Sequence, residues 1–271
     1  MCRQRKECGV NEAELVLTHI LRCDRMSLYL NKDTGLDKDK SVILSSILKR
    51  RMLGEPVQYI LGRCEFMGLE FKIDRRALIP RPETEILVES AIGGLRDSGN
   101  ARPRVLEIGT GSGCIAVAIA RNIKGADIWA SDISQEALQL AGENARCNNT
   151  RIRFVRGDLF DALHPEDGKF DLIISNPPYV AEVDFSSLAR EISFEPQAAL
   201  NGGRDGLDFY RRIITGAAAY LENSGSLMFE IGMGQAGVVK RMLENEGFGC
   251  LSSVRDYNGI ERVVSAKKGM F

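Results

Sequence analysis

Histidine and paired cysteines are scarce in this chain of 271 residues. The two histidines are His19 and His164, and none of the seven cysteines has a partner at CxxC spacing. Because histidine and cysteine are the usual protein ligands of zinc, we expect no metal site. Scattered cysteines are typical of reduced thiols, which predicts a cytoplasmic protein. We expect both histidines to be solvated or structural, so the sequence offers no evident general base.

Long apolar runs are also missing. No stretch approaches the roughly 20 residues that a membrane-spanning helix needs, and the N-terminus lacks the apolar core of a signal peptide. We therefore expect no membrane association. The formal net charge is −1, and residues 1–80 carry 15 Lys and Arg against 11 Asp and Glu. This local excess is too small to predict stable binding to nucleic acid.

The sequence divides into three predicted parts. Residues 1–55 predict a small helical domain that begins with Asn11 as a helix cap and contains a second amphipathic helix over Lys40–Leu53. We expect the inward face of that second helix to comprise Val42, Ile43, Leu44, Ile47 and Leu48. Gly54 and Pro56 would end it. Residues 56–79 predict a β-hairpin linker, and residues 80–271 predict a catalytic domain.

Strand and helix patterns alternate after residue 80. The expected strands are Arg104–Ile108, Asp127–Ser131, Arg153–Arg156, Leu172–Ser175 and Ser226–Ile231. The expected helices are Gly113–Asn122, Gln135–Cys147, Leu207–Leu221 and Gln235–Glu246, after one that begins at Pro82. This alternation predicts an α/β fold with a doubly wound, mostly parallel sheet. Two late strands, Cys250–Arg255 and Arg262–Ala266, are expected to form an antiparallel hairpin at the sheet edge.

A glycine-rich loop follows the first strand of this domain. Gly109-Thr110-Gly111-Ser112-Gly113 combines tight-turn glycines with the start of a helix, a combination that is typical of ligand-binding loops. A dinucleotide fingerprint would need glycine where Cys114 stands, and a Walker loop would need Gly-Lys-Ser/Thr. Glu107 precedes the loop, where it is badly placed for a pyrophosphate but well placed for a cationic ligand.

Polar side chains end each of four successive predicted strands. These residues are Glu107, Asp132, Asp158 and Asn176, and parallel strands bring such positions to one ligand-binding edge of the sheet. Asp132 is placed to accept both hydroxyls of a ribose. Asp158 is placed to accept from an adenine amino group while Leu159 packs on the ring.

The tetrapeptide Asn176-Pro177-Pro178-Tyr179 follows the fourth of these strands. The two prolines stiffen the loop and remove its backbone donors. The Asn176 side-chain oxygen and the Pro177 carbonyl could then accept both N–H groups of a planar NH2 group. Tyr179 could cover that plane or face a cation. The tetrapeptide could also be an ordinary strand-ending turn.

The glycine loop, the two acids and the Asn-Pro-Pro-Tyr sequence together resemble class I S-adenosylmethionine-dependent methyltransferases, which have a Rossmann-like fold. Further stretches resemble the bacterial release factor glutamine methyltransferase family over nearly the whole chain. These stretches are Pro56–Gly62, Leu78–Glu85, Phe194–Pro196 and Asp256–Arg262.

The resemblance implies methylation of the side-chain amide nitrogen (N5) of the glutamine in the Gly-Gly-Gln loop of peptide chain release factors. The cofactor would be S-adenosylmethionine and the product S-adenosylhomocysteine. Gly109 to Gly113, Asp132, Leu159 and Asn176 would line the cofactor site, and Asn176 to Tyr179 would hold the substrate glutamine. The N-terminal helical domain would help to grip the release factor, and we expect a monomer.

Two other functions remain open at this point. An N6-adenine type of methyltransferase acting on DNA or RNA would use the same Asn-Pro-Pro-Tyr site, because an adenine amino group is also NH2 on an sp2 carbon. A non-catalytic module that binds S-adenosylmethionine or a nucleotide would not need the acceptor pair at Asn176 and Pro177.

Overall fold

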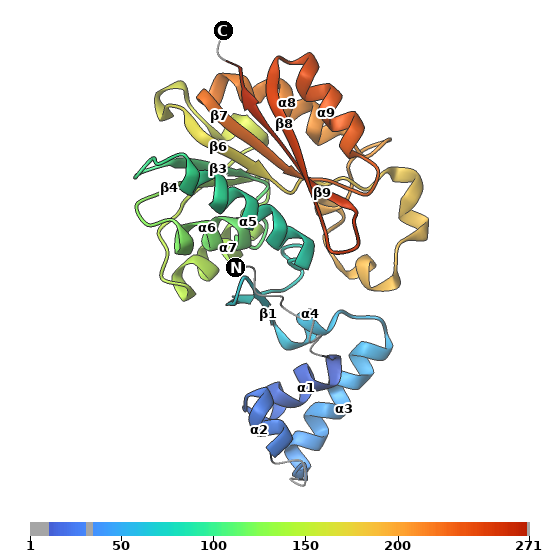
Figure 1. Ribbon diagram of the computed structural model, residues 1–271. Coiled ribbons are helices and arrows are strands. Elements are labelled where there is room, and N and C mark those ends of the chain that lie inside the picture. Colours follow the sequence, from blue (N-terminus) through green and yellow to red (C-terminus); the bar gives the residue numbers. More distant parts are fainter. Residues whose placement is uncertain (1–10, 31–34, 270–271) are drawn as a thin grey trace.

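The computed structural model describes residues 11–30 and 35–269. Residues 1–10 and 31–34 of the predicted helical domain, and with them Cys2 and Cys8, lie outside this part; the other five cysteines are free thiols. No described helix is both long enough and apolar enough to cross a bilayer. In Figure 1 a small helical unit lies below a larger domain built on a sheet, and β1 lies near their junction.

The helical unit comprises α1 (Glu12–Leu21), α2 (Arg25–Leu30), α3 (Lys38–Met52) and α4 (Val57–Leu61). Asn11 caps α1 as predicted, since its side-chain oxygen accepts from the backbone N–H of Glu14 at 2.9 Å. The sequence did not predict α4, because Pro56 was interpreted as a stop; here Pro56 is the N-cap residue from which α4 begins. Helix α4 packs on α1 and α3 around a small core of Val16, Ile20, Ile47 and Val57.

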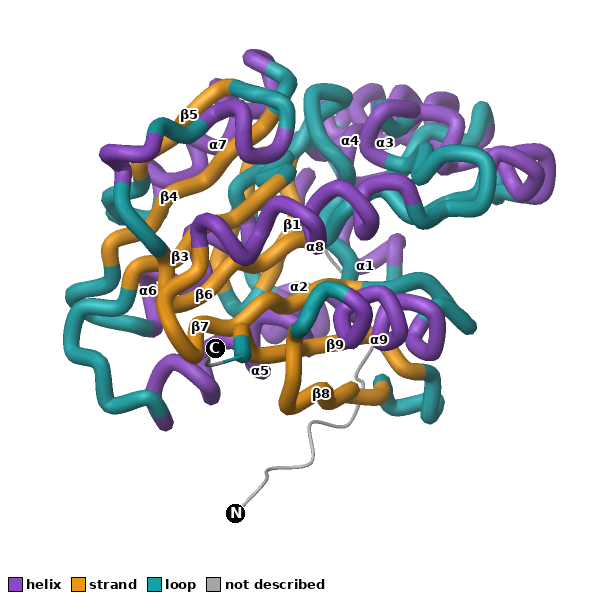
Figure 2. The backbone as a smooth tube through the Cα atoms, turned by 90° about the horizontal axis from the view of Figure 1, so that it is seen from above, coloured by secondary structure: helices purple, strands orange, loops and turns teal. Residues whose placement is uncertain are grey.

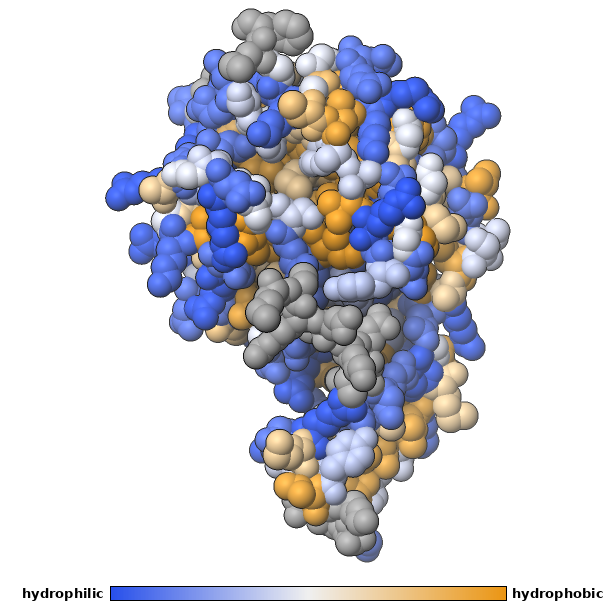
Figure 3. All heavy atoms as spheres, in the orientation of Figure 1, coloured by the Kyte–Doolittle hydropathy of each residue, from blue (hydrophilic) through white to orange (hydrophobic). Residues whose placement is uncertain are grey.

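The predicted inward face of α3 was largely wrong. Ile47 is buried and Leu44 partly so, but Val42, Ile43 and Leu48 are exposed. The physical reason is that the other elements of this small unit cover only one side of α3. The exposed large apolar side chains of this unit, on α2, α3 and the residue after α3, are Met26, Tyr29, Leu30, Val42, Ile43, Leu48, Met52 and Leu53. Apolar atoms are visible on this unit in the lower part of Figure 3.

The predicted hairpin links the unit to the sheet domain. It consists of β1 (Arg63–Phe66) and β2 (Leu69–Lys72), which pair antiparallel with Phe66 opposite Leu69. The side chain of buried Asn144 accepts from the Lys72 backbone N–H at 2.8 Å and donates to the Lys72 carbonyl at 3.0 Å. The hairpin is thereby fixed to the sheet domain rather than free to swing.

The sheet domain contains seven strands in the order β5-β4-β3-β6-β7-β9-β8 within the described residues. The first five are parallel and β9 and β8 are antiparallel, as predicted, with β9 between β7 and β8. Their bounds are β3 (Arg104–Ile108), β4 (Asp127–Asp132), β5 (Arg153–Arg156), β6 (Phe170–Ser175), β7 (Leu221–Glu230), β8 (Phe248–Arg255) and β9 (Glu261–Lys268).

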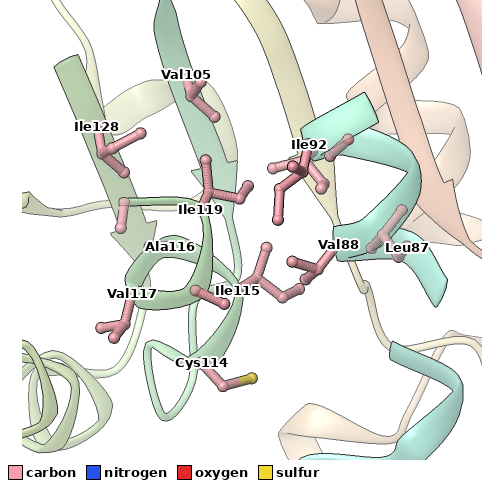
Figure 4. Close-up of a cluster of buried hydrophobic side chains, with 14 of the residues drawn as sticks. Leu87, Val88, Ile92, Val105, Cys114, Ile115, Ala116, Val117, Ile119 and Ile128 are labelled. Carbon is pink, nitrogen blue, oxygen red and sulfur yellow. The ribbon is translucent and has the colours of Figure 1, made fainter. Parts of the chain in front are cut away.

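Helices cover both faces of the sheet (Figure 2). The bounds are α5 (Pro82–Asp97), α6 (Cys114–Asn122), α7 (Gln135–Cys147), α8 (Asp208–Tyr220) and α9 (Ala236–Asn245). Short 3₁₀ turns lie at Leu159–Ala162, Pro165–Asp167, Glu182–Ser187, Arg190–Phe194 and Gln197–Ala199. One core is formed by α5, α6 and the sheet, where Val88 and Ile92 face Ile115 and Ile119 (Figure 4). The other core lies under α8 and α9. This is the doubly wound arrangement that the sequence predicted.

Candidate active site

A cavity of about 270 Å³ lies at the carboxyl ends of β3, β4, β5 and β6. Parallel α/β sheets bind ligands at this edge. Of the residues predicted for the site, those that line the cavity are Glu107, Gly109, Thr110, Gly111, Ser112, Asp132, Asp158, Leu159, Asn176, Pro177 and Pro178. The structure therefore brings together residues from four separate strand ends, as expected.

The glycine loop is held by backbone hydrogen bonds. The N–H groups of Gly109 and Thr110 both donate to the Ser131 carbonyl at 2.9 Å, so the loop is attached to β4. Gly109 has φ 74°, and no described atom lies within 4 Å of where its Cβ would be. Gly109 lines the cavity, so a ligand can approach its backbone closely.

Glu107 is buried, with one carboxylate oxygen engaged inside the protein. Its Oε2 accepts from the Thr110 hydroxyl at 2.7 Å and from the Ala116 N–H at 3.0 Å. Burial raises the pKa of Glu107 to about 8, so the free protein carries this carboxyl largely protonated at neutral pH. Glu107 thus joins the loop to α6, and a cation bound nearby would favour its ionised form.

The two acids predicted to hold a nucleoside lie on the cavity wall with capacity to accept more hydrogen bonds. Asp132 accepts from the backbone N–H groups of Gly111 at 2.8 Å and Ser134 at 2.9 Å, and burial raises its pKa. A carboxylate has about four acceptor positions, so ribose hydroxyls can still bind. Asp158 accepts from Arg212 at 2.7 Å. Leu159 beside it has φ 53°, a conformation that costs a non-glycine residue about 1 kcal/mol.

The Asn-Pro-Pro-Tyr loop leaves two acceptors facing the cavity. The Asn176 side-chain N–H donates to the Thr84 hydroxyl at 3.2 Å. Within the described residues, neither the Asn176 Oδ1 atom nor the Pro177 carbonyl oxygen accepts a hydrogen bond. Both residues line the cavity. The pair can therefore accept two N–H groups from one planar NH2 group of a ligand.

Two predicted residues are placed differently from expectation, since neither Gly113 nor Tyr179 lines the cavity. A Cβ on Gly113, which has φ 81°, would lie 2.9 Å from the Cβ of Ala141, so this glycine allows α6 to pack against α7. The Tyr179 hydroxyl donates to Glu230 at 3.4 Å, and burial raises its pKa. Its ring packs on the core beneath α8 rather than over the cavity.

Sequence reasoning missed one wall of the cavity. The segment from Arg75 to Arg81 lines it, as do Pro196, Ala198 and Ala199. Buried Glu195 anchors that segment, because it accepts from the Ile79 N–H at 3.1 Å and pairs with Arg81. The signal available in the sequence is the stiff Pro80-Arg81-Pro82 stretch together with Glu195-Pro196, since prolines hold a segment in a fixed course.

Known proteins of similar sequence or fold are methyltransferases. A family model described as "Methyltransferase small domain" matches residues 92–204, and one described as "PrmC N-terminal domain" matches residues 7–62. Among solved structures, a methyltransferase from Pyrococcus furiosus is similar with a TM-score of 0.55 at 16% identity, covering 86% of this chain and 100% of that one. The fold is that of the class I methyltransferases.

Curated relatives extend the similarity to nearly the full length. The release factor glutamine methyltransferase of Thermodesulfovibrio yellowstonii is 41% identical over 262 residues, which cover 96% of this chain and 93% of the relative. That of Geobacter sulfurreducens is 44% identical over 259 residues, which cover 95% of this chain and 89% of the relative. Identity at this level, over both the helical unit and the sheet domain, shows that the chain belongs to the release factor glutamine methyltransferase family.

Proposed function

We propose that this protein methylates the side-chain amide nitrogen of a glutamine in peptide chain release factors, at the Gly-Gly-Gln loop. The observation that carries the proposal is the pair of unoccupied acceptors on Asn176 and Pro177, at the wall of a cavity whose other residues suit a nucleoside. The family to which the chain belongs supports the identity of the substrate.

The cavity residues fit S-adenosylmethionine. The space in front of Gly109 admits a ligand against the loop backbone, Asp132 offers acceptors for ribose hydroxyls, and Asp158 with Leu159 offers an acceptor and an apolar surface for adenine. Glu107 supplies negative charge for a cationic group once it is ionised. When bound, S-adenosylmethionine supplies a methyl group activated by its sulfonium charge, and S-adenosylhomocysteine is the expected product.

The protein's own residues position and polarise the amide. A glutamine nitrogen is a weak nucleophile, because its lone pair is delocalised into the carbonyl. Asn176 Oδ1 and the Pro177 carbonyl would accept its two N–H groups and so stabilise positive charge that develops on nitrogen. Holding the amide in one orientation lowers the entropic part of the barrier. Neither His19 nor His164 lines the cavity, and we expect the released proton to reach water.

The helical unit is proposed to bind the release factor. Its exposed apolar surface on α2 and α3 has the character of an interaction site. We propose residues 1–55 for recognition, 56–79 as linker and 80–271 for catalysis, although α4 packs with the helical unit beyond residue 55. A cytoplasmic monomer without stable nucleic-acid binding is the form that we propose.

The two alternatives have less support. The relatives that match over most of the chain are named for glutamine in release factors, which does not favour an exocyclic-amine methyltransferase of DNA or RNA. A scaffold that only binds the cofactor has no need for the two unoccupied acceptors.

Transfer of labelled methyl groups tests the proposal. Purified release factor, its variant with alanine for the target glutamine, and nucleic acid are offered in parallel to wild type, Asn176→Ala and the control Asn100→Ala. Asn100 is an exposed residue that bonds Asp171, away from the cavity. We expect label on intact release factor alone. Asn176→Ala should lower the rate at least ~10²-fold while cofactor binding survives. Label on nucleic acid, or transfer by Asn176→Ala at the wild-type rate, would overturn the proposal.

A further inference from the structure

Asn176 can catalyse transfer in only one of its two amide orientations. An Asn side chain offers an oxygen acceptor on one side and an NH2 donor on the other, and the two are nearly equal in shape. If the amide were reversed, its NH2 would face the NH2 of the substrate, and the acceptor bond from Asn176 would be replaced by donor–donor repulsion while the Pro177 carbonyl could still accept. Some other group must therefore fix which end of Asn176 faces the cavity.

A buried chain of hydrogen bonds runs from Asn176 through Thr84, which also lines the cavity, to Glu230. The Asn176 Nδ2 atom donates to Thr84 Oγ1 at 3.2 Å, and Thr84 Oγ1 donates to Glu230 Oε2 at 2.6 Å. Thr84 is 2% exposed and Glu230 is 1% exposed. Glu230 ends β7, whose Phe229 pairs with Ser175, so it lies beside Asn176 at the same sheet edge.

The direction of these bonds follows from elementary chemistry. Thr84 donates its single hydroxyl proton to Glu230 Oε2. Burial raises the pKa of Glu230 to about 7, and once ionised above that pH the carboxylate can only accept. The Thr84 oxygen then has only lone pairs to offer, and Asn176 must present its N–H to it. The Asn176 oxygen is consequently turned toward the cavity, as an acceptor for the substrate.

We propose that Thr84, oriented by Glu230, is a positioning residue that fixes the amide orientation of Asn176 and so selects an NH2-bearing substrate. This inference rests on the proposed function of the site. Glu230 also accepts from the Tyr179 hydroxyl at 3.4 Å. Through this second contact Tyr179 joins the same buried network, although it does not line the cavity.

The test compares Thr84→Val, which keeps the shape of the side chain but removes the hydroxyl, with Thr84→Ser, which keeps the hydroxyl. We expect Thr84→Val to lower kcat on release factor about 10²-fold. The Kd of S-adenosylmethionine should stay near wild type, and KM for the release factor should rise by no more than about tenfold, which is the contribution of the amide orientation to binding. Thr84→Ser should restore kcat to within a few-fold of wild type.

A binding measurement without turnover shows whether Thr84 orients the Asn176 amide or only packs against it. A release factor with glutamate in place of the target glutamine presents a carboxylate to two acceptors, so wild type should bind it at least about tenfold more weakly than the glutamine form. Thr84→Val frees Asn176 to reverse and to donate to that carboxylate. The preference for glutamine over glutamate should then shrink to about two- or threefold.

Each outcome decides a separate question. If wild type does not methylate the release factor, the proposed function fails. If wild type does and Thr84→Val is equally fast, only the positioning role fails. The positioning role also fails if Thr84→Val loses activity through a lower Tm or weaker cofactor binding while its preference for glutamine is unchanged.

Discussion

Alanine at Gly113 and alanine at Gly109 should damage the protein in different ways, although both glycines belong to one loop. Gly109 has φ 74° and Gly113 has φ 81°, so the backbone strain of an added Cβ is similar at both, about 1–2 kcal/mol. The surroundings differ. No described atom lies within 4 Å of a Cβ at Gly109, whereas at Gly113 it would lie 2.9 Å from the Cβ and 3.1 Å from the Cα of Ala141.

The contact with Ala141 determines how much more Gly113→Ala destabilises the protein than Gly109→Ala does. Backbone atoms of α7 cannot move aside as a flexible side chain can, so overpacking adds about 1–3 kcal/mol at Gly113. Gly109→Ala should therefore lower the free energy of unfolding by about 1 kcal/mol. Gly113→Ala should lower it by about 3 kcal/mol, which is the sum of strain and overpacking. Cofactor affinity should fall more in Gly109→Ala than in Gly113→Ala, because Gly109 lines the cavity and Gly113 does not.

Urea unfolding and calorimetric titration of S-adenosylmethionine on the same preparations measure both effects. We expect Gly109→Ala to lose at least about tenfold in affinity for S-adenosylmethionine with little loss of stability, since the backbone can no longer approach the ligand closely. Gly113→Ala should lose stability and keep an affinity near that of wild type. Equal destabilisation of the two variants would refute the packing argument, and unchanged affinity in Gly109→Ala would refute the placement of the cofactor against the loop.

Two more predictions concern charge and surface. Burial raises the pKa of Glu107 to about 8 from 4.5, so between these pH values the unfolded chain releases a proton that the folded chain keeps. The free energy of unfolding should therefore fall by a few kcal/mol as pH rises through this window. Urea titrations at several pH values should show that Glu107→Gln makes this fall less steep. If the unfolding free energy of the variant depends on pH as steeply as that of wild type, Glu107 does not have the raised pKa. On the helical unit, Val42→Asp should raise KM for release factor several-fold with kcat and Tm near wild type, because Val42 is 68% exposed. Val183→Asp, at an exposed apolar residue of the sheet domain, is the matched control, and an equal rise of KM there would argue against a specific surface.

Most of the sheet domain could be predicted from local sequence. The bounds of β3, β5 and α7 agree with the expectation because apolar runs, helical spacing and the glycine loop are local signals. The burial of α3 was not predictable in the same way. Its apolar residues could all have faced a core, and only the small size of the helical unit leaves Val42 and Leu48 exposed.

Local sequence likewise predicts some residues of the candidate site and not others. Residues at strand ends, such as Asp132 and Asn176, were predictable because parallel topology collects them at one edge. The contact between Thr84 and Glu230 joins residues 146 positions apart, and nothing in either local stretch signals the other. Chemistry that depends on such tertiary contacts becomes visible only in the folded chain.

Direct hydrogen bonds and ion pairs hold the helical unit at a set distance from the cavity. The Tyr59 hydroxyl of α4 donates to the Ala77 carbonyl of the cavity wall at 2.7 Å, and Glu55 binds both Arg50 of α3 and Arg75 beside the cavity. If that unit binds the release factor as proposed, the loop that carries the glutamine must span this distance, and we expect glutamines in much shorter or longer loops to be poor substrates.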